Sequence, residues 1–365
     1  MPVLRSASLD AKGKDTAAAG EKHQIKHESP EKKRTKTEEN RIAGESISDS
    51  EELVETNGDS ESEKSPKAPE ASKNGEKDDA VKPSQEHDVP SNTLEKGIVY
   101  FFIRGRVNTD EPEGVDDIAR SYMILRPIPK DARLGEGPMG DSGHTRVLVL
   151  PKKTFPVSPK DRFMAFVSMS KASYQDLKDD FLASSEYVTK TVGTRHIPQA
   201  TPIAEGVYAI TSTGRESHFA YILTLPQKLD EVQKELGLKR QGSFIISTKS
   251  PKYPGPANAR LPKGPEYPEE ILEDFRDLRW MPSKSVHLNY ANAQILLIGE
   301  RSGIDKATEP QDEEQKKGKD NKEVLENLEE DDLKRMQHLG EDESESIFAD
   351  LHVQAKDYPA LQMSF

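Results

Sequence analysis

The distribution of aromatic residues is the sequence feature that most constrains how this chain can fold. Residues 1–96 contain no Phe, Tyr or Trp, whereas residues 97–300 hold 19 of the 22 aromatic residues in the 365-residue chain. A segment without aromatics and rich in Lys, Glu, Ser, Asp and Pro cannot bury enough apolar surface to offset its ordering entropy. We therefore expect a disordered segment over 1–96 and a folded core over 97–300. Residues 301–365 are expected to form an acidic, mostly disordered tail with a helix near 322–339.

The charge follows the same division. The chain carries 52 Lys and Arg against 65 Asp and Glu, a net charge of −13, of which residues 1–96 contribute −6, the core +2 and the tail −9. The nearly neutral core lacks the strongly basic footprint of a dedicated nucleic-acid-binding domain. The absence of Cys excludes disulfides, thiolate zinc sites and a Cys nucleophile. Neither a transmembrane run nor a secretory signal is visible, so we expect a nuclear or a cytoplasmic protein without membrane partners.

The core reads as strands interleaved with a few helices. Helical spacing of apolar residues, or a helix-opening proline, marks residues 173–187, 229–236 and 268–278. Strands that come in pairs between helices predict an α+β fold with a single mixed or antiparallel sheet. Eight segments are rich in β-branched and aromatic residues, which favour strands: IVYFFIRGRV (98–107), SYMILRPIP (121–129), TRVLVLP (145–151), RFMAFVSM (162–169), GVYAITS (206–212), HFAYILTL (218–225), GSFIISTK (242–249) and AQILLIG (293–299).

Two stretches of the core resemble each other. GIVYFFIRGR with SYMILRPIP, and GVYAITSTGRES with FAYILTLPQ, both read as strand, Gly-Arg turn, strand and proline stop. A duplicated α+β unit would explain the similarity, and the ordinary chemistry of hairpins would explain it equally well.

The familiar catalytic and nucleotide-binding motifs are absent. The chain has no phosphate-binding loop, dinucleotide fingerprint, nucleophile elbow or zinc-protease motif. His and acidic residues are scattered without metal-ligand spacing, so we assign no catalytic residue, no metal and no cofactor.

Gly, Thr, Arg and His recur together in three loops. Glycine lets backbone amides approach a ligand, Arg binds carboxylate or phosphate, and His can act as an acid or base. If two loops converge, they form an anion or small-molecule site; otherwise they are turns whose Arg residues pair with acids. The first loop is Gly143-His144-Thr145-Arg146, and the candidate ligand-binding residues of the other two are Arg195, His196, Arg215 and His218.

A basic, proline-rich loop offers a second candidate surface. Cations with nearby tyrosines can hold a nucleic-acid backbone and stack bases, and prolines also make a stiff protein-docking surface. The candidate nucleic-acid or partner residues are Lys249, Lys252, Arg260 and Lys263.

The tails carry short regulatory patterns. Lys32, Lys33, Arg34 and Lys36 form a basic cluster of the kind that import receptors read. Lys26 stands in an apolar-Lys-any-Glu pattern for SUMO conjugation, and Ser48 and Ser60 precede acids as kinase targets do. The acidic and apolar residues after 322 are typical of segments that fold on a partner. A solvated charge run or a helix docked on the core are the structural alternatives.

Several long strings in the core resemble one protein family. GIVYFFIRGRVN, ARSYMILRPIP, GSFIISTKSPKYPGPANARLP and YPEEILEDFRDLRWMP are similar to a fungal family commonly labelled "BTB domain transcription factor". The resemblance covers about 97–300 and implies a nuclear setting. It supplies no catalytic residues, and the core shows no BTB-type pattern, because that fold is smaller and richer in helix.

These observations favour a non-enzymatic nuclear interaction module in transcription or chromatin regulation that binds protein partners through its tails. The first alternative is an anion-binding or small-molecule-binding domain, or an enzyme, built on the Gly-Thr-Arg-His loops. The second is direct nucleic-acid binding through the Lys249–Lys263 loop.

Overall fold

The computed structural model describes residues 81–83, 89–190, 193–255, 261–311, 320–339 and 343–365. All of them belong to one compact unit.

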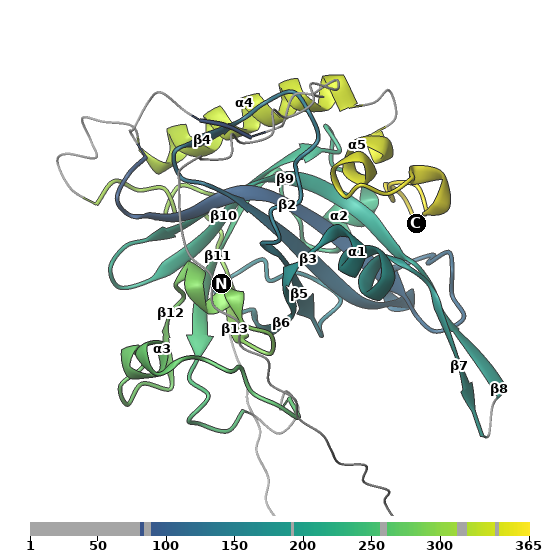
Figure 1. Cartoon of the computed structure of the whole chain (residues 1–365), viewed down its shortest axis with the longest axis horizontal. Helices are drawn as coiled ribbons and strands as arrows, with labels where there is room; N and C mark the ends of the chain where they lie inside the picture. The colour runs from purple at the N-terminus through teal and green to yellow at the C-terminus, as the bar shows by residue number, and fades with distance from the viewer. Residues whose placement is uncertain (1–80, 84–88, 191–192, 256–260, 312–319, 340–342) are drawn as a thin grey trace, which may run out of the picture. The chain divides into compact units, whose positions relative to one another are not determined.

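Eight antiparallel strands close into a β-barrel (Figure 1). Around the barrel the order is β2-β3-β5-β6-β13-β11-β10-β9, and β9 pairs again with β2. Two four-stranded meanders, β2-β3-β5-β6 and β9-β10-β11-β13, therefore meet along the pairs β2–β9 and β6–β13. The strands are β2 (Thr93–Gly105), β3 (Ile118–Ile128), β5 (Thr145–Leu150), β6 (Arg162–Ala172), β9 (Ala200–Ser212), β10 (Ser217–Leu225), β11 (Gln241–Lys249) and β13 (Gln294–Gly299).

The predicted α+β fold is wrong, because the sheet closes on itself and the helices expected between its strands are single turns. The region 173–187 forms α1 (Tyr174–Asp176), one π-helical turn η2 (Leu177–Leu182) and then strand β7 (Ser185–Thr189). The other two expected helices are α2 (Glu231–Glu235) and α3 (Glu269–Asp274). The stretches compared in the sequence form the hairpins β2–β3 and β9–β10 without an α-helix between their strands, so neither is an α+β unit.

Short elements complete the described chain. The strand β8 (Gly193–Ile197) pairs with β7 to form a two-stranded ribbon that projects from the barrel (Figure 1). The others are β1 (Val81–Pro83), η1 (Val115–Asp117), β4 (Ala132–Leu134), β12 (Trp280–Pro282), η4 (Ser285–Asn289) and η5 (Ala355–Asp357).

Aromatic rings fill the barrel interior. Phe155 packs on Phe101 with ring centroids 5.3 Å apart, and Phe101 packs on Tyr221 at the same spacing. Contacts from Tyr221 to Phe244 and from Phe244 to Phe219 continue this chain of rings at 5.6 and 6.3 Å. It ends at Tyr208, 5.1 Å from Phe219. These rings pack like an ordinary protein core and leave the axis of the barrel occupied.

Both ends of the barrel are covered. At one end Leu236 of the turn after α2 accepts a hydrogen bond from the Phe155 amide at 2.8 Å. At the other end α3 and η4 pack below the sheet, where His287 lies between Tyr267 and Phe275. Beside His287, the buried Arg146 pairs with Glu95 at 2.7 Å and also binds Asn289.

The outer wall is covered on one side by the C-terminal helices. In β2, Val99, Phe101 and Ile103 face the interior, while alternate residues face outward and are equally buried. Helices α4 (Asn321–Leu339) and α5 (Glu343–Asp350) supply the covering side chains Leu325, Leu328, Met336, Ile347 and Phe348. The region expected to be a mostly disordered tail thus packs on the barrel in its described ranges, and β2 begins before residue 97.

A buried group of ionisable side chains ties these helices to the wall. We call this group the charged cluster; it consists of Arg335, Asp332, Glu205 and Asp350. Arg335 of α4 donates to Asp332 at 2.6 Å, to Glu205 of β9 at 2.7 Å, and to Asp350 of α5. All four side chains are fully buried. Tyr100 and Thr224, on barrel strands, donate to Asp350 and Asp332, and Arg126 donates to the Asp350 carbonyl at 2.6 Å.

Burial moves the acids of this cluster away from their ordinary pKa values. Burial, together with the Asp332 carboxylate, raises the pKa of Glu205 well above its ordinary value, and burial also raises the pKa of Asp332. The guanidiniums of Arg335 and Arg126 hold the pKa of Asp350 below its ordinary value in spite of its burial. Two guanidiniums thus compensate the three acidic side chains, and buried charges are tolerated only when they are paired in this way.

Replacing Arg335 with Met will strongly destabilise the fold. The change leaves three acidic side chains buried without their shared partner, and breaking such a pair costs about 3–5 kcal/mol. Urea unfolding measures the loss. Lys334→Met is the matched control, because Lys334 lies on the exposed side of α4, where it pairs with Glu330; we expect it to change stability by less than about 1 kcal/mol. Equal effects of the two substitutions would contradict a structural role for the cluster.

His287 makes stability fall in weak acid. Burial lowers the pKa of His287 to about 4 from an ordinary value of 6.5. Between these values the unfolded chain binds the proton and the folded chain does not, so stability falls as the pH drops below 6.5. From pH 6.5 to pH 5 the loss is about 2 kcal/mol. His287→Gln, which still offers an acceptor to the Lys284 amide, should lose less stability than wild type by about that amount in urea unfolding at the two pH values. Equal losses would argue against this titration.

Candidate functional site

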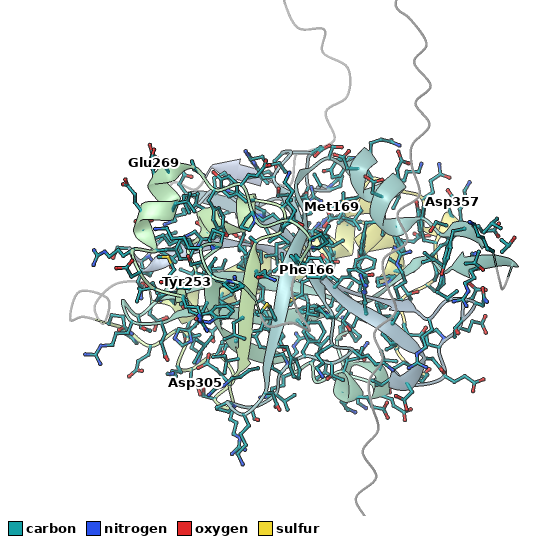
Figure 2. All side chains as sticks on the ribbon, turned by 90° about the horizontal axis from the view of Figure 1, so that it is seen from below. Phe166, Met169, Tyr253, Glu269, Asp305 and Asp357 are labelled. Carbon is teal, nitrogen blue, oxygen red and sulfur yellow. The ribbon has the colours of Figure 1, made fainter. Side chains whose placement is uncertain are left out.

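A groove of about 550 Å³ lies on the outer wall of the barrel, on the part of the wall that the C-terminal helices leave uncovered. Its floor comes from three neighbouring strands, with Tyr122 on β3, Val149 on β5, and Phe166 and Met169 on β6. Figure 2 shows Phe166 and Met169 near each other on this face. The other lining residues are Arg104, Gly105, Val107, Ala119, Arg120, Ser168, Asp179, Asp180, Phe181, Ala183, Ser185 and Ile197.

Strand alternation and the break after β6 produce the groove. Ala165 and Val167 of β6 point into the barrel, so Phe166 between them points outward. The chain then turns into α1, capped by Ser173, whose hydroxyl accepts from the Asp176 amide at 3.2 Å. This places η2 beside the strands, where Phe181 packs edge-on against Tyr122 with centroids 5.0 Å apart. The π-helical turn therefore forms one wall of the groove.

Arg104 fixes the rim where the groove meets the ribbon. Its guanidinium donates to the carbonyl of Pro198 at 2.7 Å, to that of Ala183 at 3.2 Å, and to that of Phe181. These acceptors lie at the end of η2 and just after β8, so one side chain holds both walls of the groove in place. Because its donors bind backbone carbonyls of the protein itself, Arg104 is not aimed at an anion.

The surroundings of the groove are acidic. Asp179 and Asp180 are exposed on η2, and the segment between β2 and β3, which supplies Val107 to the lining, is rich in acids; the exposed Arg120 of β3 also lies in the lining. These acids are Asp110, Glu111, Glu113, Asp116 and Asp117. At the tip of the ribbon Val188 is 80% exposed, and Tyr187 beside it is 40% exposed. The site therefore combines an apolar floor, an acidic rim and an adjacent ribbon with exposed apolar side chains.

The Gly-Thr-Arg-His loops do not converge. Arg195 and His196 lie on β8, just before β9, whereas Arg215 follows β9 and His218 lies on β10. The 13 residues of β9 separate the two pairs, and a strand of that length spans about 40 Å. The predicted pocket between these loops is therefore not formed. Arg146 of the first loop is the buried partner of Glu95.

Both histidines of these loops pair with acids. His196 lies 2.9 Å from Asp110 on the protein surface. His218 is fully buried, with its Nδ1 atom 2.8 Å from Glu300. Burial alone would raise the pKa of Glu300, but hydrogen bonds from His218 and Ser243 hold it below its ordinary value. Ser243 donates to the same Glu300 oxygen at 2.7 Å rather than to the imidazole, so His218 does not activate it as a nucleophile.

The basic loop does not present a row of free cations. Lys249 is buried, and Lys263 pairs with Glu266 at 2.7 Å. Lys252 is exposed near the Arg276 carbonyl at 3.4 Å, and Arg260 lies outside the described residues. The candidate import residues Lys32, Lys33, Arg34 and Lys36, and the modification candidates Lys26, Ser48 and Ser60, also lie outside them.

The groove itself was missed by sequence reasoning. RFMAFVSM was interpreted only as a strand, and 173–187 only as a helix. The signal available was the outward pair Met164 and Phe166 in a strand whose inward residues already supply the core. Met169 joins the outer face only through the register shift after Val167, which the sequence does not report. What covers or leaves open an outward face depends on distant segments, here α4 and α5.

Within the described ranges, no helix is both long and apolar enough to cross a membrane, and no group of three or more His, Asp and Glu side chains is placed to hold a metal ion. Comparison of the chain with protein-family models, with curated protein sequences and with solved structures gives no match.

Proposed function

We propose that the protein is a non-enzymatic interaction module of the nucleus, acting in transcription or chromatin regulation, and that it binds a segment of a partner protein in the groove. The observation that carries the proposal is the contrast between the two faces of the barrel wall. The inner face packs a continuous chain of aromatic rings, whereas on the outer face the half-buried Phe166 and Met169 of β6 line a groove beside the buried Tyr122 and Val149.

The groove has the size and chemistry of a protein-docking site. Its volume of about 550 Å³ lies within the range of ordinary ligand sites, and it is open along the wall rather than enclosed. An aromatic residue and a methionine on the floor suit binding of a peptide, because Met adapts its shape and Phe supplies a large apolar contact. Exposed apolar surface rimmed by polar residues is typical of interaction sites.

The acidic rim selects the charge of the partner segment. Asp179 and Asp180 border the floor and outnumber the exposed cation Arg120, and the acids of 110–117 lie in the segment that supplies Val107 to the lining. Complementary charge steers association and disfavours acidic partners. A segment with apolar residues flanked by Lys and Arg is therefore the favoured occupant.

The nuclear setting rests on the sequence. The basic cluster at 32–36 is of the kind that import receptors read, and the resemblance to the fungal family implies the same location.

Peptides selected from a random display library against the full chain will bind the groove and be enriched in Lys and Arg around apolar residues. Replacing both Phe166 and Met169 with Ala should weaken a selected peptide at least about tenfold, because truncating interface anchors costs more than about 1.4 kcal/mol. Fluorescence anisotropy measures the affinity. Leu278→Ala, at a position that is 52% exposed elsewhere on the surface, is the control and should leave it unchanged. Peptides that bind the variant with both Phe166 and Met169 replaced as tightly as they bind wild type would refute the groove as the docking site.

Deleting residues 32–36 should move a fluorescent fusion of the full chain from nucleus to cytoplasm, because the deletion removes four cations from the basic cluster. Imaging of living cells provides the readout, and deletion of the acidic residues 76–80 is the control of equal length. Nuclear accumulation that survives the deletion would rule out this cluster as the signal.

A further inference from the structure

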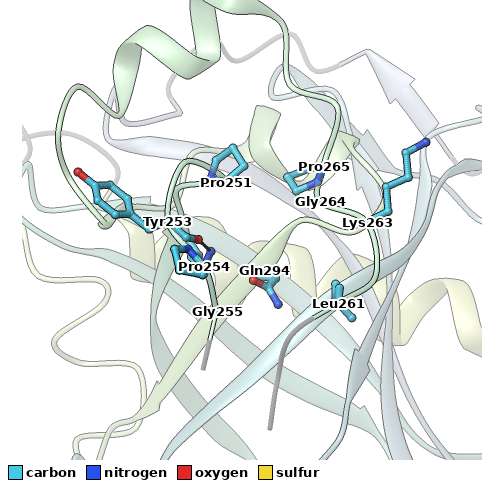
Figure 3. Close-up of a pocket in the computed structure, with 10 residues that line it drawn as sticks. Pro251, Tyr253, Pro254, Gly255, Leu261, Lys263, Gly264, Pro265 and Gln294 are labelled. Carbon is cyan, nitrogen blue, oxygen red and sulfur yellow. Dashed lines mark hydrogen bonds between the residues drawn. The ribbon is translucent and has the colours of Figure 1, made fainter. Parts of the chain in front are cut away.

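A second, smaller pocket lies below the barrel in the proline-rich loop that follows β11 (Figure 3). Its volume is about 200 Å³, and its walls come from both described sides of that loop and from the first residue of β13. The lining residues are Lys249, Pro251, Tyr253, Pro254, Gly255, Leu261, Lys263, Gly264, Pro265 and Gln294. Two of these residues are cations and none is an acid, whereas the lining of the groove includes Asp179 and Asp180.

Lys249 is the cation that belongs to the pocket. Lys249 is only 6% exposed, and its ammonium group donates to the carbonyls of Ser250, at 3.1 Å, and Tyr253. Lys263, by contrast, pairs with Glu266 at 2.7 Å, and Figure 3 shows its side chain directed away from Gln294. The charge of Lys263 is therefore balanced by the carboxylate of Glu266, whereas no such partner balances the charge of Lys249 among the described residues.

No acid of the described residues forms an ion pair with Lys249. The charged side chain that acts on Lys249 is another cation, Arg279, whose guanidinium lies 5.5 Å from the centre of the Tyr253 ring. Burial, with the Arg279 charge, lowers the pKa of Lys249 below its ordinary value. A buried ammonium without a counter-charge is unfavourable, and an anion beside it removes that cost.

The hydrogen-bond inventory leaves one donor for such an anion. A lysine ammonium has three N–H donors, and two of those of Lys249 are taken by the Ser250 and Tyr253 carbonyls. The same two carbonyl oxygens disfavour a multiply charged ligand next to the amine. Around them, Pro251, Pro254, Pro265 and Leu261 make walls that suit an apolar body.

We propose that this pocket binds a monoanionic carboxylate on a compact apolar body, with the carboxylate accepting the free N–H donor of Lys249. The carboxylate belongs either to a free small acid or to the C-terminal residue of a peptide, and both sources present the same group to the amine. The site is separate from the groove and does not depend on the function proposed for it.

Titration of the full chain with sodium benzoate, at constant ionic strength, tests the site. Binding should shift the ¹³Cε resonance of Lys249 in a saturable manner, and benzamide, which has the same shape without the charge, should not. Lys249→Met should weaken benzoate binding at least tenfold in calorimetry, while the exposed control Lys252→Met should leave it unchanged. The resonance reports on the wild-type protein, so the result stands even if Lys249→Met perturbs the fold.

Two further arms separate the sources. Isobutyrate and acetate test smaller free acids, and a short peptide ending in Leu is compared with its C-terminal amide. Tighter binding of the peptide acid than of the free acids assigns the site to a protein terminus, and the reverse order assigns it to a small molecule; both support the site. The proposal is overturned if none of these carboxylates shifts the Lys249 resonance, or if folded Lys249→Met binds benzoate as tightly as wild type.

Discussion

The burial of β2 and β9 on both faces is the constraint on which the rest of the structure depends. A closed sheet has an interior that side chains must fill and an outer wall that they must leave to water or cover. Here β2 and β9 are buried at nearly every position, so their outer face has to be covered. The C-terminal helices provide that cover, and the charged cluster around Arg335 holds them in place. We therefore expect the barrel to lose stability when α4 and α5 are removed.

The same constraint explains where a partner can bind. The interior is occupied by rings, and the wall over β2, β9 and β10 lies under α4 and α5. The wall over β3 and β5 is covered in part, by Phe181 of η2 on Tyr122 and by Asp350 of α5 on Arg126, whereas Phe166 and Met169 of β6 stay half-buried. The groove is what remains where this cover ends. The two candidate sites then differ in charge, with acids around the groove and an unpaired lysine in the proline-rich pocket.

The strands could be predicted from the sequence, but the closure of their sheet into a barrel could not. All eight segments rich in β-branched and aromatic residues are barrel strands, because that composition records burial directly. The pairing of β2 with β9 joins residues about a hundred positions apart, and no local pattern reports it. Helical spacing in 173–187 was correct for η2 but failed for β7. The Gly-Thr-Arg-His loops share a composition because they share turn chemistry, and the length of β9 keeps them apart.

The meander topology also determines when the protein can take shape during its synthesis. The seam β2–β9 joins the two meanders at their first strands, and the seam β6–β13 joins them at their last, so the first meander stays open along both sides until the second has been made. The apolar wall of β2 remains exposed longer still, until Arg335 and Asp350 have left the ribosome. A nascent chain therefore displays the apolar residues 98–103 of β2 until the C-terminal helices have been made, which is the period when such chains most depend on chaperones.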